Sequence, residues 1–150
     1  LSKPIKWTAL SKILEKYKNL TKSRHLLIVD DDTATRIILR KMLLKDGWRV
    51  VEAVHGKHAL KCLEDEQPEL ILLDLLMPVM DGFEFLNKIR HNKNWKNIPI
   101  IVITSKDLTD EDYAFLSTNV DQVIQKGKYT RKELIKLIDT TIKKTHHIRV

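Results

Sequence analysis

The sequence predicts an α/β protein built on a doubly wound parallel β-sheet, and three observations support this fold class. Short runs of Ile, Val and Leu alternate with longer amphipathic stretches five times along the chain. The short runs are apolar at nearly every position, which is typical of strands buried on both faces. The amphipathic stretches between them supply helices that would cover both faces of a parallel sheet.

The first two strand–helix pairs are expected between residues 25 and 66. The first strand is a short apolar run, and Gly47 closes the helix that follows it. The second strand is rich in Val and precedes a helix with one apolar face. In chain order the elements are expected at residues 25–30, 33–47, 48–54 and 56–66. The first helix has apolar residues at helical spacing at Ile37, Ile38, Met42, Leu43 and Leu44, and the second has them at Ala59, Leu60 and Leu63.

Three further strand–helix pairs complete the pattern. Pro68 introduces the third strand, and the last two helices each begin with a capping-box spacing. These boxes pair Thr109 with Asp112 and Thr130 with Glu133. In chain order the elements are expected at residues 69–74, 83–90, 99–104, 108–116, 121–126 and 130–144.

Composition limits the class of protein. The chain has 150 residues, enough for one domain with an appendage, and its 43% hydrophobic content argues against disorder. It has no apolar run near the ~18 residues that span a bilayer, and residues 1–10 do not resemble a signal peptide. Cys62 is the only cysteine, so no intrachain disulfide can form. We therefore expect a cytoplasmic protein with no membrane partner.

The net charge of +7 is distributed unevenly. Residues 1–25 carry seven Lys or Arg and one acid, and residues 126–150 carry eight and two. Residues 26–125 carry twelve Lys or Arg and seventeen acids, so the centre is acidic and only the two ends are basic. Basic helical ends are more often solvated faces or linkers than nucleic-acid footprints. We expect no nucleic-acid partner within this chain.

Polar residues follow four of the five expected strands. Asp30 and Asp31 follow the first strand, Asp74 the third, Thr104 ends the fourth and Lys126 ends the fifth. Each is ordinary alone, as an aspartate after a strand often caps a helix, the role expected of the neighbouring Asp32. Parallel strands, however, deliver their carboxyl ends to one edge of the sheet. We therefore expect three carboxylates, a hydroxyl and an ammonium to meet in one crevice.

This set of groups suits phosphoryl chemistry. Two or three close carboxylates bind a hard divalent cation, and Mg²⁺ fits such a site, with Mn²⁺ as an alternative ion. A carboxylate beside the cation could attack a phosphoryl group in line, while the cation and the lysine neutralise charge on its oxygens.

The motifs VDDD, LLDLLMPVMDG, VITS and QK stand at residues 29–32, 72–82, 102–105 and 125–126 in an order and spacing that resemble the receiver domain of two-component response regulators. The resemblance covers residues 25 to about 145. It implies a flavodoxin-like (βα)₅ fold with strand order 2-1-3-4-5. It also implies that the domain accepts a phosphoryl group from a histidine kinase domain or phosphotransfer protein, and that it catalyses this transfer and its own slow dephosphorylation.

The same resemblance assigns roles to the residues at the strand ends. Asp74 is implied to be the phospho-accepting nucleophile, Lys126 to contact the phosphoryl oxygens, and Thr104 to turn inward and hydrogen-bond the phosphate. Gly82 is implied to shape the loop after the acceptor. The implied Mg²⁺ site comprises Asp31, Asp74 and the backbone carbonyl of Leu76, with Asp30 acting mainly through a metal-bound water.

Three positions depart from the pattern of the family or leave a role open. Family members usually have Pro immediately after the lysine, where this chain has Gly127, so we expect a more mobile loop. Val123 occupies a place that often holds an aromatic residue which swings inward on phosphorylation. Lys106 is either a second cation near the phosphoryl group or an ordinary solvated lysine.

We expect three regions: an N-terminal helix or linker at residues 1–22, the receiver at 24–145 and a tail at 146–150. The sequence of residues 3–17 has Lys-Pro followed by an apolar stripe, and resembles the tail of an upstream receiver; an ordinary linker helix is the alternative. The stripe comprises Trp7, Leu10, Ile13, Leu14 and Tyr17.

The motif QKGKYTRKEL resembles receivers at the C-terminus of hybrid histidine kinases, which makes adjacent receivers candidate partners. The competing function is an interaction module with a receiver fold that acts through partner binding, without a phosphorylation-driven switch.

Overall fold

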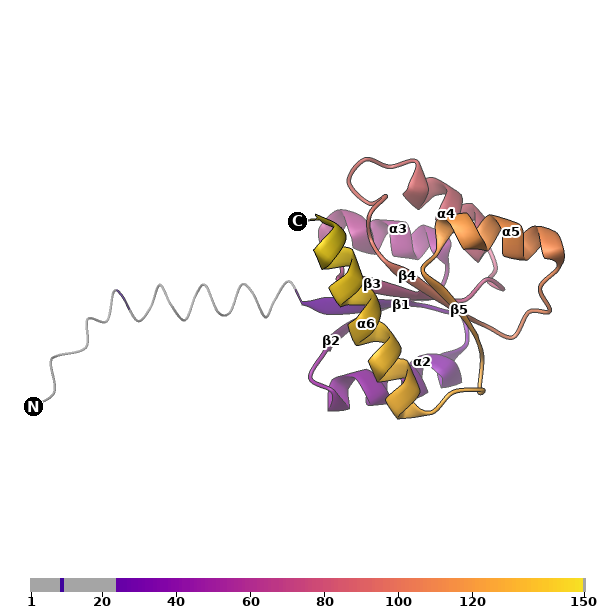
Figure 1. Cartoon of the computed structure of the whole chain (residues 1–150). Helices are drawn as coiled ribbons and strands as arrows, with labels where there is room; N and C mark the ends of the chain where they lie inside the picture. The colour runs from indigo at the N-terminus through magenta and orange to yellow at the C-terminus, as the bar shows by residue number, and fades with distance from the viewer. Residues whose placement is uncertain (1–8, 10–23, 150) are drawn as a thin grey trace, which may run out of the picture.

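The five predicted strands form one parallel sheet in the order β2-β1-β3-β4-β5 in a computed structural model that describes residue 9 and residues 24–149. This confirms the predicted fold class and strand order (Figure 1). The predicted N-terminal helix at residues 1–22 lies, apart from residue 9, outside the described residues. The strands are β1 (His25–Val29), β2 (Arg49–Ala53), β3 (Leu70–Leu73), β4 (Ile100–Thr104) and β5 (Gln122–Gln125).

Burial within the sheet follows strand position. Every residue of β1, β3 and β4, the three central strands, is buried. The edge strands β2 and β5 are only partly covered, which matches their more polar sequences RVVEA and QVIQ. Near-continuous aliphatic runs are stable at the centre because helices cover both faces of a parallel sheet there.

Helices cover both faces of the sheet (Figure 1). One face packs against α3, α4 and α5 around Phe85, and the other packs against α2 and α6 around Leu43 and Ile138. The helices are α2 (Thr33–Lys45), α3 (Gly56–Asp65), α4 (Gly82–Arg90), α5 (Asp110–Asn119) and α6 (Arg131–Arg149). Helix α6 thus continues past residue 145. None of the described helices combines the length and apolar character of a membrane span.

Local sequence signals set the helix starts as predicted. Asp32 caps α2 by accepting a hydrogen bond from the backbone N–H of Thr35. The capping box of Thr109 and Asp112 opens α5. Each such cap typically contributes about 1 kcal/mol by satisfying backbone donors that the first helical turn leaves free. The reciprocal hydrogen bonds between Thr130 and Glu133 form the box that opens α6.

Only part of the apolar surface of helix α2 is buried. Its buried residues are Leu39 and Leu43, one turn apart. Ile37, Ile38 and Leu44, which share the predicted apolar spacing, are instead 47%, 53% and 49% exposed. Apolar residues surround this helix on most sides, so spacing alone does not identify the side that packs. Helix α2 therefore presents three exposed apolar side chains, Ile37, Ile38 and Leu44, to solvent.

Candidate functional site

The carboxylates of Asp30 and Asp74 lie side by side because β1 and β3 are neighbours. Val29 is paired with Leu73 at the end of their ladder, and the next residue on each strand is the aspartate. The Asp74 backbone N–H donates to the carbonyl of Val29 at 2.9 Å, which continues the pairing by one residue. Asp30 is 2% exposed and Asp74 3%, so both carboxylates are almost fully removed from solvent.

Lys126 provides the charge that compensates these two carboxylates. It follows β5, and its Nζ lies 3.0 Å from Oδ2 of Asp30 and 3.2 Å from Oδ2 of Asp74. The Lys126 ammonium therefore contacts side chains at the ends of β1 and β3. These two strands are neighbours, and β4 separates them from β5. Charge-assisted hydrogen bonds of this length are stronger than neutral ones, so the contact fixes the three side chains relative to one another.

The remaining oxygens of the two buried carboxylates have backbone partners. Oδ1 of Asp30 accepts a hydrogen bond from the N–H of Asp32 at 2.8 Å, and Oδ1 of Asp74 accepts one from the N–H of Leu76 at 3.3 Å. These bonds explain how polar groups persist at the end of buried strands.

Asp31 completes an acidic group at this edge. Its side chain is exposed, and one oxygen each from Asp30, Asp31 and Asp74 lies within 4.8 Å of the others. Three carboxylates at this spacing, one of them open to solvent, form a donor set that suits a hard divalent cation. The predicted ligands Asp30, Asp31 and Asp74 are therefore together, whereas the predicted role of the Leu76 carbonyl stays a prediction.

Burial and charge shift the pKa values of two members of the site. Burial raises the pKa of Asp30 above its ordinary value, and the hydrogen bond from Asp32 and the contact with Lys126 offset this only in part. Burial lowers the pKa of Lys126, but its contacts with Asp30 and Asp74 outweigh this effect and leave that pKa raised. Lys126 therefore stays protonated, whereas burial makes the ionised form of Asp30 less favourable than it is in water.

Thr104, at the end of β4, is 2% exposed, and its Oγ1 accepts a hydrogen bond from the backbone N–H of Lys106 at 3.2 Å. The Nζ of Lys106 lies 2.8 Å from Oδ2 of Asp112 in the first turn of α5. The hydrogen bond from Lys106 holds the pKa of Asp112 below its ordinary value. Lys106 is thus paired with Asp112 rather than simply solvated, and its role as a second cation at the site stays a prediction.

Gly82 supports the loop that follows Asp74. A Cβ atom at this position would lie 2.7 Å from the carbonyl oxygen of Asp74 and 2.7 Å from Cα of Leu75. Those are backbone atoms, so a larger residue would displace the acceptor strand itself. The structure therefore explains the glycine of the LLDLLMPVMDG motif as a close approach between α4 and the end of β3.

Arg36 is a site residue that sequence reasoning did not identify. Its Nη1 donates to the backbone carbonyl of Asp30 at 2.8 Å, and its Nε donates to Glu52 at 3.2 Å. The guanidinium thus joins the start of α2 to the end of β1 and to β2. A single arginine on an amphipathic helix carries no distinguishing pattern, so only the fold reveals this role.

Gly127 adopts a left-handed conformation, with φ of 73°. Proline cannot adopt it, because its ring fixes φ at about −65°. No described residue has a cis peptide bond. The loop after Lys126 therefore follows a path of its own, while Val123, at the place often held by an aromatic residue, is half-buried on β5.

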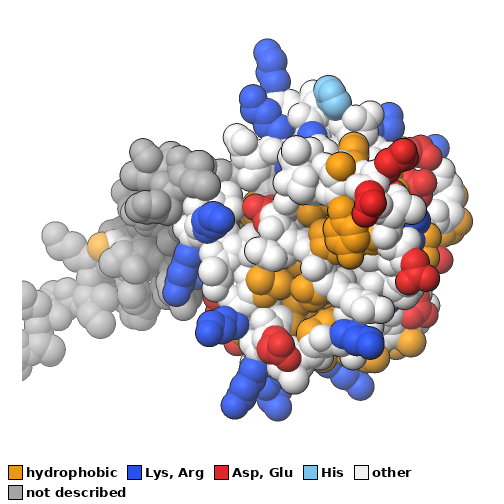
Figure 2. Space-filling model, turned by 45° about the vertical axis from the view of Figure 1, so that its right-hand side comes forward, with side chains coloured by type: hydrophobic (Ala, Val, Ile, Leu, Met, Phe, Trp, Pro, Cys, Tyr) orange, Lys and Arg blue, Asp and Glu red, His pale blue; other side chains and the backbone are white. Residues whose placement is uncertain are grey.

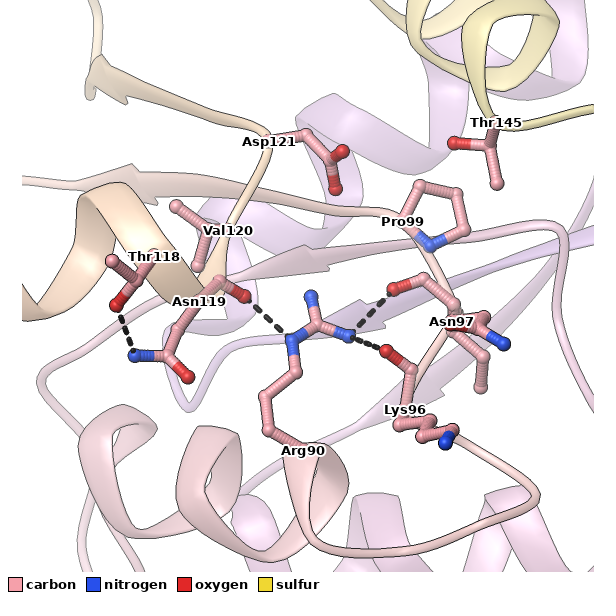
Figure 3. Close-up of a pocket in the computed structure, with 10 residues that line it drawn as sticks. Arg90, Lys96, Asn97, Pro99, Thr118, Asn119, Val120, Asp121 and Thr145 are labelled. Carbon is pink, nitrogen blue, oxygen red and sulfur yellow. Dashed lines mark hydrogen bonds between the residues drawn. The ribbon is translucent and has the colours of Figure 1, made fainter. Parts of the chain in front are cut away.

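A separate cavity of about 290 Å³ lies at the amino ends of the strands, next to Pro99 before β4 and Asp121 before β5 (Figure 3). The guanidinium of Arg90 reaches into this region from the end of α4. It donates to the backbone carbonyls of Lys96, Ile98 and Asn119 at 2.9, 3.0 and 2.7 Å. Burial lowers the pKa of Arg90. These bonds tie three chain segments together, a structural role remote from the carboxylates.

Similarity to a known protein family determines the class of this domain. The family model described as the response regulator receiver domain matches residues 26–139, more than half of the chain and all of the site residues. This chain belongs to the response regulator receiver family. The predicted resemblance is therefore confirmed, and the matched range includes the residues at the carboxyl ends of the strands.

Similar proteins agree with this assignment. Response regulator MprA of Mycolicibacterium vanbaalenii is 32% identical over 120 residues, which are 80% of this chain and 51% of that relative. The chain thus spans about half of the length of this relative. A CheY-like receiver domain protein from Methanospirillum hungatei is 27% identical, with a TM-score of 0.75 and coverage of 83% of this chain and 97% of the other.

A further similar structure is the receiver domain of a sensor histidine kinase from Pseudomonas aeruginosa, described with a magnesium ion coordinated in its active-site cleft. It is 26% identical, has a TM-score of 0.72, and the match covers 81% of this chain and 98% of the other. Receiver domains of this kind serve two-component signalling, in which histidine kinases or phosphotransfer proteins are their partners.

Proposed function

We propose that this receiver accepts a phosphoryl group on Asp74, in a reaction that requires Mg²⁺. The observation that carries the proposal is the contact of one ammonium, on Lys126, with both buried carboxylates, beside the solvent-open Asp31. A purely structural ion pair would not need a third carboxylate exposed at the same edge. The arrangement supplies a nucleophile, a cation for phosphoryl oxygens and a place for a metal.

In this reaction a carboxylate oxygen of Asp74 attacks phosphorus as the bond between phosphorus and a phosphohistidine nitrogen breaks. The imidazole that leaves takes a proton from solvent, and an acyl phosphate forms. Lys126, already within 3.2 Å of Asp74, would pair with the phosphoryl oxygens. Thr104, which ends the adjacent strand β4, offers a hydroxyl donor to the same group.

The acidic group fits Mg²⁺ through its chemistry. Hard carboxylate oxygens are the ligands that Mg²⁺ prefers, and an exposed carboxylate leaves room for the waters that this ion retains. When bound, the ion would supply positive charge to the transferring phosphoryl group. Asp30, Asp31 and Asp74 would hold it, with the Leu76 carbonyl as the further ligand we propose. The magnesium site of the Pseudomonas aeruginosa receiver supports this assignment.

We further propose that a histidine kinase domain or a phosphotransfer protein docks over α2. Helix α2 begins at Thr33, two residues after Asp31, and exposes Ile37 and Ile38. The loop after the acceptor exposes Leu76 and Val79, which are 47% and 74% exposed. Exposed apolar residues on the two segments that follow Asp31 and Asp74 favour a protein donor over a small molecule alone.

We favour a hybrid histidine kinase as the parent protein, with this receiver in the cytoplasm. Adjacent receivers of the same protein would then be further partners. The motif QKGKYTRKEL and the similarity to a receiver of a sensor histidine kinase support this context.

Intact-mass measurement with acetyl phosphate and Mg²⁺ tests the proposal, with Asp74→Asn as control. One phosphoryl group should be added to the wild type, none to the variant, and none when EDTA replaces Mg²⁺. Modification of the Asp74→Asn variant to the same extent would contradict the proposed acceptor.

The second candidate function is an interaction module without a phosphorylation-driven switch, which the half-buried Val123 favours because an aliphatic side chain cannot repeat an aromatic swing. Hydrogen exchange of β5 and α5 before and after phosphorylation separates the two functions. Protection that changes in this region supports a switch, and unchanged protection in a fully phosphorylated sample supports the module.

A further inference from the structure

Asp31 is the exposed carboxylate of the acidic group, so burial does not fix the direction of its side chain. It follows the end of β1, on the side of the molecule at which the strands end. Figure 2 turns this side, the right-hand side of Figure 1, toward the viewer and shows acidic and hydrophobic side chains exposed together on it. A metal ligand has to be held within a narrow range of positions. The direction of the Asp31 side chain therefore depends on the two peptide groups on either side of its Cα atom.

Hydrogen bonds hold both of these peptide groups. In the peptide before the Cα of Asp31, the carbonyl oxygen of Asp30 accepts a hydrogen bond from Nη1 of Arg36 at 2.8 Å. In the peptide after it, the N–H of Asp32 donates to Oδ1 of Asp30 at 2.8 Å. The N–H of Asp30 also donates to the carbonyl of Ala53 at 3.1 Å, which ties this stretch to β2. The backbone that carries Asp31 is thus fixed on both sides, and the bond on one side comes from the side chain of Arg36.

The guanidinium of Arg36 is itself held in place. Its side chain is 14% exposed, its Nε lies 3.2 Å from Oε1 of Glu52 on β2, and its Nη2 donates to Oγ1 of Thr33 at 3.3 Å. A guanidinium presents its donors in a rigid planar fork, so these two contacts also fix the direction of Nη1. Lysine has a single ammonium on a flexible stem and cannot make the three bonds with the same geometry.

The contact with Glu52 alone does not account for Arg36. Arg40, one turn further along α2, places its Nη1 3.2 Å from the other carboxylate oxygen of Glu52. A second arginine, whose side chain is 56% exposed, therefore also joins α2 to β2. Of the two, Arg36 is the one that the structure describes in contact with the carbonyl of Asp30. Arg40 is thus a matched comparison, with the same charge, the same helix and the same carboxylate partner.

Charge and position give Arg36 opposite effects on a cation at the acidic group. A guanidinium repels a divalent ion, so the loss of its charge alone should strengthen the binding of the ion. The loss of a well-positioned ligand should weaken binding instead, because groups that orient metal ligands typically contribute about 10–100-fold to metal affinity. The sign of the change in affinity therefore separates the two effects.

We infer that Arg36 is a positioning residue of the metal site: it holds the peptide between Asp30 and Asp31, which keeps the Asp31 carboxylate within reach of the other two carboxylates. The inference rests on the proposed function and deepens it, since it gives a residue outside the acidic group a part in binding the cation. In this role Arg36 touches neither the cation nor the phosphoryl group. Its substitution should change the affinity for Mg²⁺ and leave the transfer step, which depends on Asp74 and Lys126, nearly unchanged.

Calorimetric titration of the full chain with Mg²⁺ tests the inference in Arg36→Met, which removes the donor, and Arg36→Lys, which keeps the charge and the aliphatic stem. Both variants should bind Mg²⁺ about tenfold more weakly than the wild type. Arg40→Ala, the matched control, should bind it as well as the wild type or slightly better, because it loses a charge while the carbonyl of Asp30 stays held. With acetyl phosphate at saturating Mg²⁺, all three variants should be phosphorylated within about twofold of the wild-type rate.

Two results would overturn the inference, in samples that circular dichroism shows to be folded. Unchanged or tighter Mg²⁺ binding by Arg36→Lys would leave Arg36 only as a link between α2 and β2. Equal weakening in Arg40→Ala would show that the loss of either arginine suffices, whatever it contacts. Both results leave the proposed function intact when the wild type binds Mg²⁺ and is phosphorylated. A wild type that binds no Mg²⁺ would contradict the proposed function and this inference together.

Discussion

The Nζ of Lys126 lies 3.2 Å from Oδ2 of Asp74, although the two residues are 52 positions apart in the chain. The same ammonium contacts Asp30 at 3.0 Å. The protein therefore compensates two buried carboxylates with one cation. Because metal and lysine neutralise the same acidic group, the stability of the fold and the chemistry of the site are coupled.

Replacing Lys126 with alanine should destabilise the metal-free protein and impair phosphorylation. Without the ammonium, Asp30 and Asp74 face each other with no cation, which should lower the free energy of unfolding by about 1–3 kcal/mol at neutral pH. The rate of phosphorylation by acetyl phosphate should fall by on the order of 10²-fold, because a cation aimed at the phosphoryl oxygens is lost. Urea denaturation in EDTA and intact-mass kinetics measure the two effects.

Lys128→Ala is the matched control, since this exposed lysine is two positions away and does not contact the carboxylates of the site. It should change stability by less than about 0.5 kcal/mol and leave the rate unchanged. Equal behaviour of the two variants would show that the loss of any nearby positive charge, rather than the Lys126 contact, is responsible.

Asp30→Asn should stabilise the metal-free protein at neutral pH, by on the order of 1 kcal/mol. The pKa of Asp30 is raised in the folded state by burial, so the folded protein binds this proton more readily than the unfolded chain. Stability therefore falls as pH rises from 3.8, the ordinary value, through the raised folded pKa. The neutral amide removes that cost and should flatten this part of the pH–stability curve, followed by thermal unfolding in EDTA.

Asp32→Asn is the control, because the pKa of Asp32 is shifted in the opposite direction to that of Asp30. Hydrogen bonds from Thr35 lower the pKa of this exposed carboxylate, so its contribution to stability is present above 3.8 and is lost as pH falls through the lower folded value. The variant should show no gain in stability at neutral pH. A gain equal to that of Asp30→Asn would mean that general relief of negative charge, not burial of Asp30, is the cause.

Leu39→Ala and Ile38→Ala, on the same helix, should differ strongly in stability. Leu39 is 2% exposed and Ile38 is 53% exposed. The first substitution should cost about 2–5 kcal/mol and the second less than about 1 kcal/mol. Urea denaturation of both variants compares the two costs. Similar costs would place Ile38 in a packed environment and remove the argument for an apolar docking surface on α2.

The positions of the site residues could be predicted from the sequence because each follows an apolar run. The end of such a run marks the end of a buried strand, so sequence alone predicts that Asp30, Asp74 and Lys126 share one edge of the sheet. The helix caps were equally predictable, because a capping box such as that of Thr109 and Asp112 depends only on residues three positions apart.

The remaining features depend on tertiary packing. The ion pair of Lys106 with Asp112 and the hydrogen bond from Arg36 to the carbonyl of Asp30 join separate elements, and no local pattern predicts either. The packed side of α2 is equally hard to predict, because Ile37 and Ile38 are as apolar as the buried Leu39. Only the position of the sheet determines which of them is covered.

Substitutions at Gly127 test the path of the loop after Lys126. Its φ of 73° is left-handed, and a Cβ atom at this position would meet no other atom within 4 Å, so any cost is conformational rather than steric. Gly127→Ala should cost about 1 kcal/mol, Gly127→Asn less, since asparagine tolerates this region, and Gly127→Pro more, since its ring forbids it. Urea denaturation should rank the loss of stability in the order Gly127→Asn, Gly127→Ala and Gly127→Pro, with the proline variant the least stable. A proline variant as stable as the wild type would show that the loop readily adopts the turn usual in the family.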